Sequence, residues 1–186
     1  MGTITIKGGI NSSTNAAAGT MTISSDVTLI VQGEIASTNS TSGGNIPTAI
    51  NNNGGTVTIS SGANVWKEAT SGATIVNSTG TITISEGAIV SHAGTNPYNS
   101  PAVIFLTGGN LVMTGGTVTH TGTVSNIPVI SNSSNGAVLI EGGEVRASNA
   151  TRVAISRAAS AGTVTVHIPP TVIFGTFSGD ITVIEE

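Results

Sequence analysis

The chain has 186 residues, of which 8% are charged and 3% are aromatic; it contains no cysteine and carries a formal net charge of −4. Five basic residues are too few to neutralise a run of phosphates, so nucleic acid is not expected as a partner. The missing cysteines exclude disulfides and thiolate metal sites, and the sequence shows neither an apolar run long enough to span a membrane nor a signal peptide at residues 1–4.

A six-residue pattern recurs along the whole chain, and Gly55 to Ser60 (Gly-Thr-Val-Thr-Ile-Ser) is a clear copy of it. Copies begin at glycines 2, 19, 55, 80 and 162, and diverged copies begin at glycines 109 and 136. The successive steps are 17, 36, 25, 29, 27 and 26 residues. A period in the twenties with β-type units is typical of a solenoid, so we expect residues 1–186 to form a single β-solenoid domain.

Taken in chain order, each coil offers three short extended runs separated by Gly, Asn, Ser or Pro. The first runs are 56–59, 81–84, 111–113, 138–140 and 163–167; the second are 63–67, 88–92, 117–121, 144–147 and 171–174; the third are 73–76, 102–106, 128–131, 152–155 and 181–184. This pattern predicts an all-β fold, a right-handed parallel β-helix of about seven coils with three short strands per coil.

The first run alternates strictly between apolar and hydroxyl side chains. Val57 and Ile59 fall on one face and Thr56 and Thr58 on the other, so we expect the apolar face in the core and the threonines outside. The same split predicts core positions at residues 4, 6, 21, 23, 82, 84, 111, 113, 138, 140, 164 and 166. At the ends of the third runs, Asn51, Asn77 and Asn132 predict a partial asparagine ladder.

Two resemblances follow from these strings. Residues 73–85 and 108–119 resemble the Gly-Gly-Thr-Val-Thr repeats of large bacterial cell-surface β-helix proteins, a likeness that covers about residues 19–175. The paired Thr-x-Thr resembles the ice-contacting strands of β-solenoid antifreeze proteins, in which outward threonines hold water in an ice-like array. Carried over, the ice-binding face consists of Thr3, Thr5, Thr20, Thr22, Thr56, Thr58, Thr81, Thr83, Thr163 and Thr165. The sequence departs from that pattern at Asn110/Val112 and Ala137/Leu139.

Few residues in the sequence point to catalysis or metal binding. The two aspartates, Asp26 and Asp180, fall in different coils, so we expect neither catalytic residues nor an enzyme. Three histidines on separate coils do not have metal-ligand spacing, so no metal or cofactor is expected, and solvated or corner positions are predicted for them. By strand alignment, His92 should lie beside Lys67, and His120 should align with Trp66 and Phe174.

Two functions of different classes remain. The first is a non-catalytic ice-binding solenoid whose partner is an ice surface or another repetitive extracellular surface. The second is a structural or adhesive β-helix segment of a bacterial cell-surface protein, with Trp66 and Tyr98 as an aromatic platform for carbohydrate; in that case the threonines reflect only good β propensity. Both imply an extracellular or cell-surface location, and both leave open the oligomeric state and whether the chain is part of a larger protein.

Overall fold

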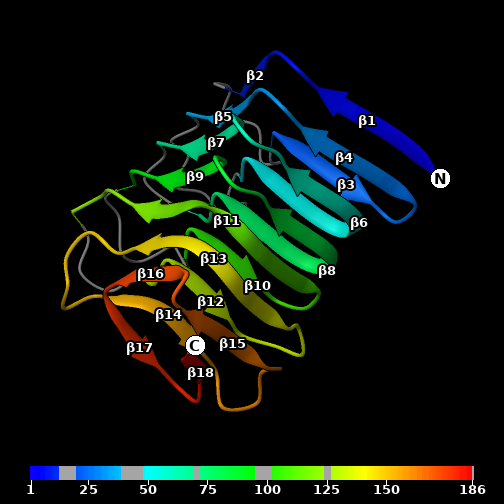
Figure 1. Cartoon of the computed structure of the whole chain (residues 1–186). Helices are drawn as coiled ribbons and strands as arrows, with labels where there is room; N and C mark the ends of the chain where they lie inside the picture. Colours follow the sequence, from blue (N-terminus) through cyan, green and yellow to red (C-terminus); the bar gives the residue numbers. More distant parts are fainter. Residues whose placement is uncertain (13–19, 39–47, 69–71, 95–101, 124–126, 186) are drawn as a thin grey trace.

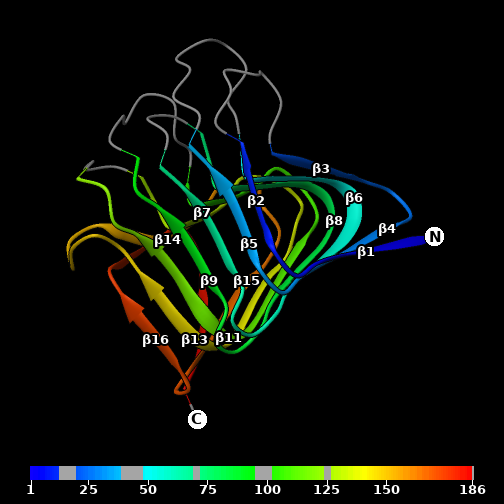
Figure 2. The ribbon, with the colours of Figure 1, turned by 90° about the horizontal axis from the view of Figure 1, so that it is seen from above.

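The computed structural model describes residues 1–12, 20–38, 48–68, 72–94, 102–123 and 127–185. These residues contain eighteen β-strands and no helix, and the strands stack in parallel into a three-sided β-solenoid (Figure 1). The described part of the chain therefore holds no helix that could cross a membrane. Viewed from the N-terminal end, the chain runs clockwise from β1 through β2 to β3 as it recedes, which is the right-handed sense (Figure 2).

Three parallel sheets form the sides of the solenoid, and four long strands bend across a corner and serve two sheets. Sheet 1 contains β1 (Gly2–Ile6), β4 (Val27–Val31), the second halves of β6 (Ile50–Ile59) and β8 (Ile75–Ile84), the first halves of β11 (Asn110–His120) and β13 (Val138–Arg146), β15 (Val164–Ile168) and β18 (Thr182–Glu185).

The other two sheets complete each coil. Sheet 2 contains β2 (Gly9–Ser12), β5 (Glu34–Ser37), β7 (Asn64–Lys67), β9 (Ile89–His92), the second halves of β11 and β13, and β16 (Thr171–Phe174). Sheet 3 contains β3 (Met21–Ser24), the first halves of β6 and β8, β10 (Ile104–Leu106), β12 (Ile130–Asn132), β14 (Val153–Arg157) and β17 (Thr176–Ser178).

The register corrects two positions in the expected coil sequence. The run at Met21–Ser24 belongs to sheet 3, and Val27–Val31 is the strand of sheet 1 in that coil. At the other end, Thr182–Glu185 pairs with β15 in sheet 1, so Thr176–Ser178 is the last strand of sheet 3. From β1 to β15 the chain thus makes six turns, against about seven expected, before a shorter step to β18.

The core is a stack of aliphatic side chains, as the alternation predicts. Val57, Ile59, Ile82 and Ile84 are fully buried, and their equivalents in later coils are buried with them. Each such side chain contributes on the order of 1.5–3 kcal/mol of hydrophobic free energy. Ile4 departs from the expectation because it lies on β1, at the end of the stack, where 45% of it is exposed.

A partial asparagine ladder supports the corner between sheets 3 and 1. Asn52, rather than Asn51, is the register partner of Asn77, and its Nδ2 donates to Asn77 Oδ1 at 3.0 Å. Asn77 Nδ2 in turn donates to the Asn110 carbonyl oxygen at 2.9 Å. Leu106 interrupts the column, and Asn132 continues it by donating to the Gly136 carbonyl oxygen at 2.7 Å. The asparagine side chains therefore hydrogen-bond backbone carbonyls at this corner.

Candidate functional site

Sheet 1 carries most of the threonines that the sequence singled out, and the register aligns them in two columns. Following the strand pairs β1–β4–β6–β8, the first column contains Thr3, Thr28, Thr56 and Thr81. The second column contains Thr5, Ile30, Thr58 and Thr83. All eight side chains are exposed or half-buried, while their strand neighbours from β4 to β8 point into the core. We call these eight positions the threonine columns.

Thr20 and Thr22 do not belong with this set. Thr22 pairs with Asn51 in sheet 3, and Thr20 precedes the same strand, so both lie on another side of the solenoid. Thr28, which the sequence analysis missed, takes the place in the first column that was assigned to Thr20. The signal for Thr28 was the coil spacing: Thr3, Thr28 and Thr56 follow one another at 25 and 28 residues.

Beyond β8 the columns change character. Asn110 and Val112 pair with Thr81 and Thr83, and Leu139 on β13 follows Val112. Threonine returns on the last strands, where Thr165 pairs with Leu139 and with Thr182; Thr163 directly precedes β15. The sheet therefore presents a larger threonine area over β1, β4, β6 and β8 and a smaller one near its C-terminal edge.

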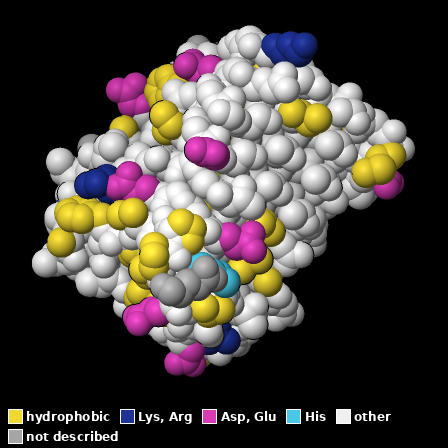
Figure 3. Space-filling model, viewed as in Figure 1, with side chains coloured by type: hydrophobic (Ala, Val, Ile, Leu, Met, Phe, Trp, Pro, Cys, Tyr) yellow, Lys and Arg dark blue, Asp and Glu magenta, His cyan; other side chains and the backbone are white. Residues whose placement is uncertain are grey.

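The geometry of the threonine columns is set by the parallel sheet. Neighbouring strands lie about 4.8 Å apart and alternate residues about 6.7 Å apart, which gives a rectangular grid of methyl and hydroxyl groups. None of the eight positions is charged, and the surface over β1, β4, β6 and β8 is mostly white in Figure 3, the colour of neutral polar side chains and backbone. No described segment crosses this face in Figure 1. Such a surface can order water without repelling or distorting it by charge.

Glycines at the corner before sheet 1 allow the coils to stack in this register. Gly80 has a φ of +86°, and a β-carbon there would collide with the carbonyl oxygen of Gly55 in the preceding coil. A side chain at this corner would therefore push neighbouring coils apart. The glycine that begins the repeat is thus what permits the close alignment of the threonines that follow it.

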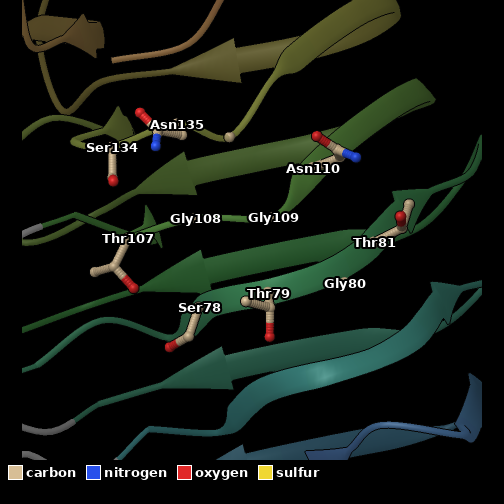
Figure 4. A pocket seen from close by; sticks show the side chains of 11 residues that line it. Ser78, Thr79, Gly80, Thr81, Thr107, Gly108, Gly109, Asn110, Ser134 and Asn135 are labelled. Atoms are coloured by element: carbon tan, nitrogen blue, oxygen red, sulfur yellow. The ribbon is translucent and has the colours of Figure 1, made fainter. Parts of the chain in front are cut away.

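A second surface feature lies at the same corner, next to the threonine columns. A hollow of about 540 Å³ is formed by three successive turns, Ser78 to Thr81, Thr107 to Asn110 and Ser134 to Gly136. Figure 4 shows hydroxyl and amide side chains from all three turns around it, including Ser78, Thr107 and Ser134. Every lining residue is neutral, so the hollow suits water or a neutral, hydroxyl-rich ligand.

The interior holds a polar feature that the sequence analysis placed wrongly. Ser37, Lys67, His92 and His120 are successive register partners in sheet 2, and all four are buried to within 1% of full burial. We call them the inner polar column. The predicted pairing of His92 with Lys67 is confirmed, but His120 pairs with His92. Trp66 and Phe174, which were expected to align with His120, align with Thr119 instead. Neither His92 nor His120 is a solvated or corner residue.

Burial dominates the electrostatics of the inner polar column. It lowers the pKa of Lys67 to about 8, because the ammonium form loses its hydration. The pKa of His120 is also lowered, first by burial and then by the positive charge of Arg152, while the carbonyl of Gly94 opposes the shift. The rings of His92 and His120 meet edge to face, with centroids 5.5 Å apart. The lowered pKa favours the neutral form of His120 at neutral pH.

The signal for the column was present in the alternation of the second runs. Lys67, His92 and His120 each stand two residues after a buried valine, so parity places them on the inward side. Their polar side chains favour an outward position, but the alternation of residues along the strand directs them into the interior. The described residues contain no cluster of three or more His, Asp or Glu that could hold a metal ion.

The remaining candidates do not come together. Asp26 precedes β4 near the N-terminal end and Asp180 precedes β18 near the C-terminal end, so the two aspartates are far apart in the stack. Trp66 lies on sheet 2, and Tyr98 lies outside the described residues.

The chain matches no protein-family model, no curated protein and no solved structure.

Proposed function

We propose that the protein is a non-catalytic ice-binding β-solenoid and that the threonine columns are its ice-contacting surface. The observation that carries the proposal is the register of Thr3, Thr28, Thr56 and Thr81 on four neighbouring parallel strands. Thr58 and Thr83 repeat the arrangement one position further along the strands. The grid of about 4.8 by 6.7 Å is close to repeats in ice, so waters held by one threonine are also placed for its neighbours.

Two further properties support this reading. A β-branched side chain has restricted χ1, so a threonine loses little entropy when it orders adjacent water. The backbone hydrogen bonds of the parallel sheet also fix the threonine positions before ice is met, so little ordering is required on binding. Because Ile30 interrupts one column and Asn110 and Val112 follow β8, the proposal places the ice contact on the first four strands of sheet 1. An ice-binding role implies an extracellular or cell-surface location.

The test is thermal hysteresis and ice-crystal shaping by the purified protein, followed by Thr58→Tyr and Thr83→Tyr. Both side chains are half-exposed, so we expect folded variants that have lost most of their activity because a bulky ring breaks the grid. Thr22→Tyr is the matched control, because Thr22 is an exposed threonine on sheet 3. A wild type that shapes no ice contradicts the proposal. Retention of activity by Thr58→Tyr, or its loss in Thr22→Tyr, would contradict the assignment of the face.

The hollow beside the columns favours a second candidate, a structural or adhesive segment of a cell-surface protein that binds carbohydrate. Its neutral hydroxyl and amide lining matches the donors and acceptors of a neutral sugar. Affinity electrophoresis in gels that contain neutral polysaccharides tests it. We expect Thr107→Tyr, which fills the hollow, to abolish retardation and Thr58→Tyr to preserve it. The reverse pattern, or no retardation of the wild type by any neutral polysaccharide, removes this candidate.

A further inference from the structure

Three titratable side chains stand next to one another inside the solenoid. Lys67 on β7, His92 on β9 and His120 on β11 are successive register partners, on strands that lie side by side about 4.8 Å apart (Figure 2). Lys67 and His92 are fully buried, and His120 is 1% exposed. No other buried residue that the structure describes is titratable. The inner polar column is therefore the place in the described interior where a change of pH can alter the charge.

The two histidines are in direct contact. Their rings meet edge to face, with centroids 5.5 Å apart and an angle of 69° between the ring planes. The backbone of Gly94, in the segment after β9, is hydrogen-bonded to His120. Because the rings are buried and packed, a proton on either of them places positive charge against the other ring and close to Lys67. Bulk water is not there to screen that charge.

The elements packed around the two histidines add no buried negative charge. On the C-terminal side, β13 carries Glu144 and Arg146, which are bonded to each other on the outer surface. Arg152, which precedes β14, adds positive charge near His120. On the N-terminal side, β5 contributes the hydroxyl of Ser37. The buried residues of sheets 1 and 3 are aliphatic or neutral polar, and every aspartate and glutamate that the structure describes is exposed or half-buried.

We propose that the inner polar column is an acid-sensitive switch, in which protonation of His92 and His120 beside the charged Lys67 opens the coils that contain β7, β9 and β11. The sign follows from proton linkage. Burial lowers the pKa of His120 below the 6.5 of an exposed histidine, so the opened chain takes up the proton first as the pH falls. The stability that the neutral ring provides is complete above pH 6.5 and is lost as the pH falls below that value.

The opening would reach the threonine columns. β6 and β8 carry four of the threonine-column residues on sheet 1, and the chain continues from them through one corner into β7 and β9. Acid would therefore disturb the outer face of sheet 1 through the interior of the same coils. The switch does not depend on what the threonines bind, because it concerns the fold itself and is measured without ice.

The experiment measures the melting temperature of the wild type and of the double variant His92→Gln/His120→Gln between pH 7.5 and pH 5 at constant ionic strength. Glutamine keeps a polar side chain but takes up no proton in this range. We expect the wild type to lose about 5–10 °C and the double variant less than half as much. His167→Gln is the matched control and should behave as the wild type, because His167 lies on β15 outside the inner polar column. Lys67→Met should reduce the loss, because it removes the neighbouring positive charge.

A second measurement does not require the double variant to fold. Hydrogen exchange of the wild type, corrected for the pH dependence of the intrinsic rate, should show β7, β9 and the second half of β11 losing protection before β13 and β15 as the pH falls to 5. An equal loss of melting temperature in the wild type and the double variant would overturn the proposal, as would no loss in the wild type. Uniform loss of protection along the whole stack would also overturn it, because the acid effect would then have no origin in the inner polar column.

Discussion

Lys67 on β7 and His92 on β9 are register partners, and both side chains point into the solenoid interior. A lysine at this position is costly because the ammonium group loses its hydration shell. Its neighbours along the inner polar column are a serine and a histidine, and neither supplies a negative charge. The column therefore makes folding depend on pH.

Lys67→Met should stabilise the protein at pH 7. The folded-state pKa of Lys67 is about 8 against 10.5 for an exposed lysine, so the wild type carries a penalty that is complete below pH 8 and disappears as the pH rises above 10.5. We expect a gain of about 2–3 kcal/mol at pH 7 that shrinks towards zero by pH 11. Urea unfolding between pH 6 and 11 measures it, with Lys7→Met as the exposed control. A gain that does not vary with pH would contradict the burial argument.

Asn77→Ala should destabilise the corner between sheets 3 and 1. Asn77 accepts from Asn52 and donates to the Asn110 carbonyl oxygen, so the substitution removes both hydrogen bonds. The expected loss is about 2–3 kcal/mol. Chemical unfolding measures it. Asn110→Ala is the control, because it keeps the carbonyl oxygen of residue 110 and loses only the exposed hydrogen bond that Asn110 Oδ1 accepts from the Ala137 N–H. Equal losses of unfolding free energy in the two variants would contradict a specific contribution of the asparagine ladder to stability.

Gly80→Ala should cost more stability than Gly62→Ala. Both glycines have positive φ, +86° and +77°, so both substitutions strain the backbone by about 1–2 kcal/mol. At Gly62 a β-carbon meets open space, whereas at Gly80 it collides with the carbonyl of Gly55. The difference between the two unfolding free energies isolates the coil contact, and we expect it to exceed roughly 1 kcal/mol. Indistinguishable values would mean that the coils separate without cost.

Ile30→Thr should increase ice activity if the threonine columns bind ice. Ile30 lies between Thr5 and Thr58 in the second column and is the only non-threonine among the eight positions. The substitution is at a half-buried surface position, so stability should change by less than about 1 kcal/mol. Thermal hysteresis at equal protein concentration is the readout. Unchanged hysteresis in a wild type that does bind ice would place the contact elsewhere.

The misplacement of Thr20 and Thr22 shows how far the repeat can be followed by pattern alone. Gly19 to Ser24 matches the repeat better than Val27 to Val31, which contains a single threonine. Alternation tells which side of a strand faces the core, but the three sides of a solenoid obey the same rule. The even spacing of β1, β4 and β6 is the better guide, because every coil must return to the same corner.

His92 and His120 illustrate the opposite limit. They are 28 residues apart in the sequence. Their ring contact, with centroids 5.5 Å apart, depends on the length of the coil between them and on the register of β9 and β11. Neither follows from residue types, and histidine chemistry favours the surface.

The sequence by itself determined the all-β solenoid, its stacked aliphatic interior and the outward direction of its threonines, because the alternation of apolar and polar residues in a strand is a local property. The tertiary structure alone decided which threonines share a sheet and that the rings of His92 and His120 meet. Such neighbours are separated by a whole coil of chain, and their alignment is set by how each coil closes on the one before it.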